Sequence, residues 1–568
     1  MKRIIVAVLG AIFGLLPLVT NTSECLFVTG VNSVSGSCNN AVYKNCDGNY
    51  FGKTFFSFRP QDSDSSRRIL GWFNADYINF NATSIFSGAA PVRGILTISP
   101  QYTRSFHTKG LAEWFFFNGS DCMTVGIPNE YESFTIDGSQ IGLSLGTVFD
   151  PETDSVSLIT GKIGTVCAKP LVENFIIDLD YWYDLSAWHD KLWSRLELPV
   201  VYMKTDMGMS SCGKGIQTDA YPLGLFSLDK TIVDAYYDEV CGSAPVPYNS
   251  IVCALEGNQG WGAVAPLKSG KFSSQSLSKW GAAGLHFDLG YDMYRSLPWY
   301  AAGSFHVVFP TGTRPKGTYV LEPVIGANKS WQVGATAIAN YIKEFRRFDF
   351  GIYFYAVGTH LFKSKQDRVF SLKPNGPGSQ LLLLKQFKVG ETGLVNAERE
   401  ANIFCGEAKI GSALMFDGSL MFQFSRDKFV ADIGYNFWVR TREKCAKRIW
   451  FRGFYEDAFG VKGDTPMEFQ DQVGCIYSAP IQCLNDPATE HCARICGPAP
   501  EDDTTITIGP CDVNYLSPLN PTAMSHKIFA AVGYKSSWFV LLTGEAEFSS
   551  NNAAISQWGV MVKVGKDF

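Results

Sequence analysis

The chain lacks any long hydrophobic run beyond its first residues. One apolar stretch, Ile4–Val19, follows Lys2 and Arg3 and is broken near its end by Pro17. This stretch is shorter than the roughly 20 residues that a membrane-spanning helix needs, and proline disfavours a continuous helix. We therefore interpret residues 1–22 as a signal peptide that is cleaved during export. No later segment could cross a membrane as a helix.

The chain also has little charge. Charged residues make up 18% of the sequence, against about 25% in an average soluble protein. The formal net charge of −5 argues against nucleic acid as a partner. Aromatic residues are 14% and glycines number 54. This composition is compatible with an outer-membrane barrel, which crosses the bilayer with strands.

The usual catalytic signatures are missing. The sequence contains no G-x-S-x-G and no H-E-x-x-H motif. Residues 208–215 come close to a phosphate-binding loop but lack the Ser or Thr that would hold Mg²⁺. We therefore expect no enzyme activity and no cofactor. A secreted all-β enzyme, the remaining catalytic alternative, would need convergent acid, base or nucleophilic groups that the sequence does not offer.

Cysteine is present but does not form a metal signature. All 15 cysteines follow the signal, from Cys25 to Cys511, so disulfides are expected in an exported chain, and the odd number leaves one thiol over. Cys492 with Cys496 has a spacing that a metal could use, but no second pair follows. His286 and His306 on neighbouring predicted strands also lack a third ligand, so we expect no metal site.

A two-residue alternation of apolar and polar side chains is the main positive signal. In residues 556–568 one parity is apolar and aromatic and the other is polar, and residues 537–548 repeat the pattern. Such alternation is typical of strands with one apolar and one polar face. The pattern predicts about fourteen strands, with a range of 12–16: 50–59, 69–80, 92–105, 173–186, 194–205, 281–293, 299–310, 329–342, 346–361, 408–424, 428–440, 526–535, 537–548 and 556–568. The first three are the weakest.

Aromatic residues bracket the apolar faces of several predicted strands at ten-residue intervals. At ~3.3 Å per residue and a tilt of roughly 40°, this interval covers about 25 Å of height, the apolar band of an outer-membrane barrel. The predicted membrane-girdle residues are Trp299, Phe309, Trp331, Tyr341, Trp538, Phe548, Trp558 and Phe568. The fold class is therefore all-β, a transmembrane antiparallel β-barrel.

The connections between predicted strands alternate in length, as expected when short turns face the periplasm and long loops face outward. Long loops are predicted at 106–172, 206–280, 362–407 and 441–525, and one or more of them could fold into the lumen. The remaining assignment is a signal peptide at 1–22, a periplasmic N-terminal segment at 23–49 and the barrel at 50–568. Many cysteines fall in the long loops, where disulfide bonds would stabilise segments that have little apolar core of their own.

At the polar positions of the predicted strands, acidic side chains outnumber basic ones. The predicted pore-lining residues are Asp178, Asp180, Glu197, His286, Asp288, Asp292, His306, Asp349, Asp432, Asn436, Glu545, Glu547 and Lys563. One interpretation is that these side chains are merely solvated in a water-filled barrel. The other is that they create a field that favours cations in transit.

The stretch 280–440 resembles porin-like outer-membrane proteins that occur in many copies in some intracellular bacteria. The residues that carry the resemblance are Phe309, Pro310, Thr311, Gly312, Pro315, Leu321, Glu322, Pro323, Gly326, Trp331, Gly334, His360, Leu361, Phe362, Gln366, Asp367 and Arg368. The resemblance implies an outer-membrane location and a channel-like fold, but no substrate. The closing strand also looks like the signal read by barrel-assembly machinery, although Lys566 departs from that pattern.

Together these observations predict a porin-like channel in the bacterial outer membrane for passive diffusion of small hydrophilic solutes, with a preference for cations. The expected partners are outer-membrane lipid and the barrel-assembly machinery. The sequence leaves a homo-oligomer open. The alternative is a surface adhesin or structural protein that uses the barrel only as an anchor.

Overall fold

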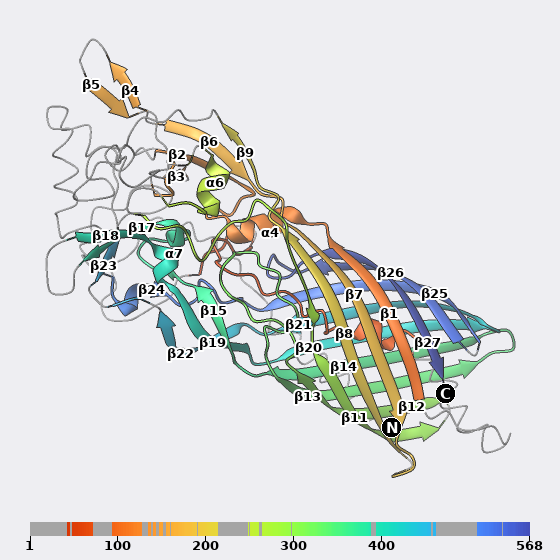
Figure 1. Ribbon diagram of the computed structural model, residues 1–568. Coiled ribbons are helices and arrows are strands. Elements are labelled where there is room, and N and C mark those ends of the chain that lie inside the picture. The colour runs from red at the N-terminus through yellow and green to blue at the C-terminus, as the bar shows by residue number, and fades with distance from the viewer. Residues whose placement is uncertain are drawn as a thin grey trace.

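The computed structural model describes residues 42–71, 94–213, 248–461 and 508–567, with short gaps inside these ranges. Its main feature is a closed antiparallel barrel of twelve strands (Figure 1). Each barrel strand pairs with the next along the chain, and the last pairs with the first. The barrel strands are β1 (Gly94–Ser105), β7 (Leu171–Asp184), β8 (Leu192–Asp206), β11 (Leu285–Ser296), β12 (Trp299–Phe309), β13 (Gln332–Glu344), β14 (Asp349–Leu361), β20 (Met415–Arg426), β21 (Phe429–Arg440), β25 (Ala523–Lys535), β26 (Trp538–Ser549) and β27 (Gln557–Asp567).

One further strand lies outside this ring. β10 (Leu277–Ala282) pairs with the C-terminal half of β8, while β11 pairs with the N-terminal half. Ala283 bridges the two, because its N–H donates to Pro199 O at 2.9 Å. β10 therefore continues the pairing of β11 along β8, but it lies outside the ring of twelve strands. The all-β barrel fold predicted from the sequence is confirmed.

The predicted strand 50–59 is wrong, most of the predicted strand 69–80 lies outside the described residues, and the other twelve predictions correspond to the twelve barrel strands. Residues 51–59 are irregular, with bends at Gly52 and Thr54, and pair with none of the described strands. Residues 69–71 end a short helix, and residues 72–80 lie outside the described residues. Phe55, Phe56 and Phe58 are buried instead among the side chains at one end of the barrel.

The long connections gather at one end of the barrel and form a folded loop domain (Figure 1). Its sheets contain β2 (Cys122–Ile127), β3 (Thr135–Asp137), β4 (Thr147–Asp150), β5 (Ser155–Leu158), β6 (Gly161–Cys167), β9 (Ser210–Gly213), β15 (Ser364–Val369), β16 (Ser371–Leu372), β17 (Leu383–Phe387), β18 (Leu394–Arg399), β19 (Cys405–Ser412), β22 (Glu443–Phe451), β23 (Phe459–Val461) and β24 (Val513–Asn514). Its helices are α4 (Thr108–Phe115), α6 (Ile251–Glu256), α7 (Glu400–Ile403), η2 (Ser379–Leu381) and η3 (Pro510–Asp512).

The loop domain has an apolar core of its own that continues into the upper barrel. Trp114 and Phe370 are completely buried, and the same cluster reaches Val201 and Trp438 on barrel strands. A disulfide between Cys122 and Cys167 joins β2 to β6. Residues 208–213, part of the near miss to a phosphate-binding loop, end in β9 rather than in a helix.

The outer face of the barrel is apolar. Leu289, Phe422, Ile433, Leu542 and Val560 point outward and are 37–57% exposed. A contiguous exposed apolar surface of this kind marks contact with lipid or another protein, and strands that close into a ring leave no unpaired edge. Among the described residues, no helix is long and apolar enough to span a membrane.

Candidate functional site in the barrel lumen

The lumen is occupied by a segment that precedes the first barrel strand. Residues 58–71, called the plug here, contain the five-residue helix α2 (Ser65–Ile69) and are almost entirely buried. Helix α2 starts after Asp64, whose carboxylate accepts hydrogen bonds from the Ser66 N–H at 3.1 Å and the Ser66 hydroxyl at 2.5 Å. Asp is a favoured N-cap residue because its oxygen satisfies a free N–H of the first turn. Arg67 and Arg68 lie in the last turn of this helix.

The first arginine of the plug, Arg59, binds three strands of the wall. Its Nη1 lies 2.7 Å from Glu547 Oε1 and 3.2 Å from Asn436 Oδ1, and its Nη2 lies 2.9 Å from Asp417 Oδ2. The guanidinium carbon is 5.6 Å from the ring centroid of Trp438. These contacts combine charge-assisted hydrogen bonds with a cation–π contact.

A second contact joins the N-cap of α2 to the strands next to the C-terminus. Lys527 Nζ lies 2.9 Å from Asp64 Oδ2 and 3.2 Å from Glu545 Oε2. Glu545 in turn accepts a hydrogen bond from Gln101 Nε2 at 2.7 Å. At this point the wall therefore supplies both the cation, Lys527, and an anion, Glu545.

The third contact places Arg67 and Arg68 against the opposite wall. Arg67 Nε lies 3.0 Å from Asp178 Oδ2, and Arg68 Nε lies 2.6 Å from Glu197 Oε2. Arg68 Nη2 also lies 2.9 Å from His286 Nδ1. Because a guanidinium can only donate, Nδ1 is the acceptor here, which leaves His286 Nε2 to donate to Asp62 of the plug at 3.2 Å.

Residues of the stretch 280–440 also hold the plug and the residues just before it. The Gly326 N–H donates to Gln61 Oε1 at 2.8 Å, and the Arg368 guanidinium stacks over Phe55 with its carbon 3.3 Å from the ring centroid. A Cβ on Gly326 would lie 2.1 Å from Ala283 O, and its φ of +74° is unfavourable for other residues. This turn therefore favours glycine twice over.

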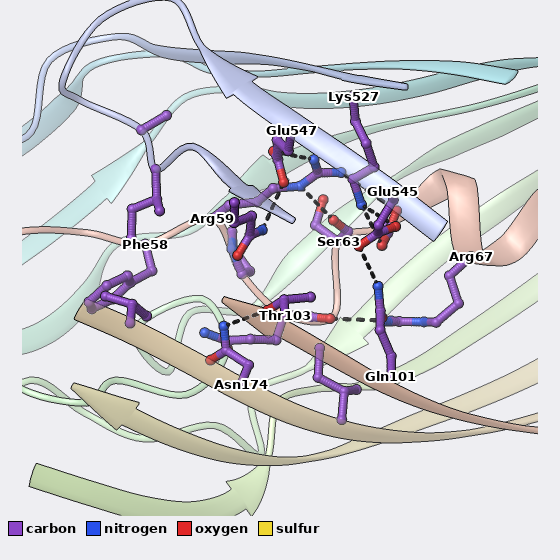
Figure 2. A pocket seen from close by; sticks show the side chains of 18 residues that line it. Phe58, Arg59, Ser63, Arg67, Gln101, Thr103, Asn174, Lys527, Glu545 and Glu547 are labelled. Atoms are coloured by element: carbon purple, nitrogen blue, oxygen red, sulfur yellow. Dashed lines mark hydrogen bonds and ion pairs between the residues drawn. The ribbon is translucent and has the colours of Figure 1, made fainter. Parts of the chain in front are cut away.

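Among the described residues, the cavities between the plug and the wall are small. A cavity of about 50 Å³ lies between Arg59, Glu545 and Glu547 on one side and Thr103 and Asn174 on the other (Figure 2). A single buried water needs roughly 10–15 Å³. The cavity can therefore hold a few water molecules but no larger solute.

The predicted pore-lining residues lie mostly where the sequence suggested, but in different surroundings. Eleven of the thirteen are buried and face the lumen, and the Glu545 side chain is only 5% exposed. Asp349 is exposed at the start of β14. In this conformation ion pairs and hydrogen bonds bury several of these side chains, and both interpretations of the polar face stay predictions for an open lumen.

The predicted girdle residues lie on the outer face. Trp299, Phe309, Trp331, Trp538, Phe548 and Trp558 are 38–54% exposed, and Tyr341 is half-buried beside Trp299 with a distance of 4.7 Å between ring centroids. Phe568 lies outside the described residues. His286 and His306 do approach each other, at 3.3 Å between Nδ1 and Nε2, and within the described ranges no cluster of three metal ligands occurs.

Sequence reasoning missed the partners of the predicted acids. Arg59, Arg67 and Arg68 lie in a segment assigned to strands and turns, and Asp417 on β20 was not singled out. The cluster of charged and small polar residues at 61–68 was the available signal, since a transmembrane strand rarely contains such a run. The expected periplasmic segment 23–49 is described only at its end, and residues 42–45, 48 and 49 lie at the loop-domain end of the barrel. Tyr50 N–H, for example, donates to Asn552 Oδ1 at 2.9 Å.

No family model and no curated protein matches the sequence. Among solved structures, an outer-membrane channel from Pseudomonas putida F1 is similar at 10% identity over 84% of this chain and 97% of that chain, with a TM-score of 0.31. A monoaromatic hydrocarbon channel shares 8% identity over 91% and 99% of the chains, with a TM-score of 0.25. The transport unit of an autotransporter from Escherichia coli shares 9% identity over 87% and 97%, with a TM-score of 0.26. Likeness at this level transfers no function.

Proposed function

We propose that this protein is a channel of the bacterial outer membrane that admits small hydrophilic cations and that is closed by its plug in the conformation seen here. The observation that carries the proposal is the chemistry of the contact between plug and wall. That contact includes hydrogen bonds and ion pairs to Asp178, Glu197, Asp417 and Glu547, next to an apolar cluster in which Ile69 and Leu70 of the plug pack against the wall. A polar contact can be exchanged for water and ions at modest cost, because water satisfies the same groups.

The preference for cations follows from the wall that the plug covers. Acidic side chains outnumber basic ones among the described lumen residues, and three arginines of the plug compensate four of the acids. If the plug moves aside, the wall presents an acidic lumen, which favours cations over anions. The outward apolar strands and the girdle residues support outer-membrane lipid as the surrounding medium.

Conductance in a planar bilayer tests the proposal. The wild-type protein should conduct rarely, and the variant R67A/R68A, which loses two contacts of the plug, should conduct at least severalfold more often, with a reversal potential on the cation side in a KCl gradient. The matched control is R346A/R347A, which removes two exposed arginines from the turn between β13 and β14 and should behave as the wild type. Heat-modifiable gel migration would confirm that each variant forms a closed barrel.

The alternative is a surface protein that uses the barrel as an anchor. The plug in the lumen and the apolar core of the loop domain favour it. Folded R67A/R68A protein that carries no current would rule out the channel and support the anchor.

A further inference from the structure

The contacts of Arg59 show the features of a binding site rather than of a single ion pair. Four wall residues surround its guanidinium group. Asp417 lies on β20, Asn436 and Trp438 on β21, and Glu547 on β26. Three separate strands therefore converge on one planar cation. Within the plug itself, Arg59 Nε donates to Ser63 O at 2.9 Å, and Asp64 Oδ1 lies 3.9 Å from Nη2.

The wall holds its own acceptors in place without help from Arg59. Glu547 accepts hydrogen bonds from the Ser525 hydroxyl at 2.5 Å and from Gln557 Nε2 at 2.8 Å. Asp417 accepts one from Asn436 Nδ2 at 2.6 Å. Glu547 therefore has donors that stay in place when the plug leaves, whereas Asp417 keeps its bond to Asn436 but also accepts hydrogen bonds from Ser63 and Ser65 of the plug. Preorganised acceptors of this kind bind a ligand with less loss of entropy.

The geometry suits a guanidinium group better than a compact ammonium. The two carboxylates receive different Nη atoms, and the Trp438 ring lies near the guanidinium carbon. Guanidinium is planar, offers five donors in a fixed fork and stacks on aromatic rings, whereas ammonium is a point charge. Trp is also the strongest aromatic partner for a cation.

We propose that Asp417, Asn436, Trp438 and Glu547 form a binding site for the guanidinium group of a small cationic solute, and that Arg59 occupies this site as an internal substitute for the solute. The inference rests on the proposed channel function and adds a class of ligand to it. The plug then competes with the solute for one site, so binding of the solute favours displacement of the plug.

The experiment uses the full chain with its own competitor removed. In R59A the site is empty, and methylguanidinium should raise the temperature of unfolding in detergent with half-saturation in the millimolar range. Tetramethylammonium and K⁺ at the same ionic strength should not. In wild-type protein, where Arg59 fills the site, methylguanidinium should have no specific effect.

A second pair of variants identifies the wall residue. R59A/E547Q should bind methylguanidinium at least tenfold more weakly than R59A, since a hydrogen bond to a charged group contributes about 1.5–3 kcal/mol. The matched control R59A/E344Q removes an exposed glutamate at the end of β13 and should bind as R59A does. Equal binding by R59A and R59A/E547Q, or equal stabilisation by tetramethylammonium, would overturn the site.

Folding itself provides the readout if R59A does not refold alone. Refolding yield should then rise severalfold with methylguanidinium and not with tetramethylammonium, and no selective rise would contradict the proposal. The outcome is separable from channel function. Selective binding without current in the bilayer would keep the site and reject the channel, whereas current without selective binding would do the reverse.

Discussion

Glu400 is the residue whose burial is least compensated. It begins α7 in the loop domain and is completely buried, and neither carboxylate oxygen has a hydrogen-bond partner among the described residues. Burial without a partner disfavours the charged form. It raises the pKa of the Glu400 carboxyl well above its usual value of 4.5.

The raised pKa predicts a pH dependence of loop-domain stability. The folded state holds the Glu400 proton at pH values where the unfolded chain has lost it, so the stability of the domain falls as pH rises above about 4.5. The slope from this group is at most about 1.4 kcal/mol per pH unit. E400Q should remove this slope and stabilise the domain at neutral pH. Hydrogen exchange at β17 and β18 between pH 5 and 8 measures the effect.

The matched control for this prediction is E398Q, which changes a half-buried glutamate on the neighbouring strand. The pH dependence should persist in that variant. An E400Q protein with the same pH dependence as the wild type would show that Glu400 does not titrate in this way.

At the scale of the strands, aromatic rings on the lumen side lie across glycines of the neighbouring strand. The cross-strand pairs are Gly290 with Trp193, Gly434 with Phe529 and Gly565 with Phe539. A Cβ on Gly434 would lie 2.2 Å from Phe529 Cζ, so the ring needs the space that glycine leaves. Rings placed over glycines fix strand register and cover the exposed backbone.

Truncation of one such ring should weaken the barrel. F529A leaves a cavity over Gly434, and loss of a buried Phe costs about 3–5 kcal/mol, so the temperature at which the gel band shifts should fall by several degrees. I433A, a change on the outer face of β21 where the side chain is 52% exposed, is the control and should change little. Equal losses in the two variants would contradict the role of the ring.

The sequence predicted the strands of the barrel but not the plug inside it. Strands such as β26 and β27 alternate because one face is apolar and exposed and the other faces the lumen, and that constraint is local in sequence. Phe55, Phe56 and Phe58 were expected in a strand, yet Phe56 and Phe58 pack into the loop-domain core, and Phe55 is buried against Arg368. The lumen acids were recognised by parity, whereas their partners are separated from them by more than a hundred residues, a relation that no periodic pattern encodes.

For the whole molecule, the path of the chain before β1 has a consequence for topology. Residues 42–58 contact the loop domain, for example through Lys53 Nζ and Leu516 O at 2.6 Å. The plug lies in the lumen, and β1 then starts at Gly94, which pairs with Tyr183 near the short turn between β7 and β8. The chain therefore runs from the loop-domain end through the barrel toward the short turns.

This path predicts that the region around Gly48 is displayed on the same side as the long loops. An epitope inserted at Gly48, where a tight turn joins Lys44 to Tyr50, should be detected by antibody on intact cells. The same epitope at Lys191, in the short turn between β7 and β8, should be detected only after the outer membrane is permeabilised. Because long loops face outward in barrels of this kind, the reverse result would mean that the barrel has the opposite orientation. Detection of both epitopes only after permeabilisation would instead show that the N-terminal segment does not pass through the lumen in the cell, and the plug could then not close a channel.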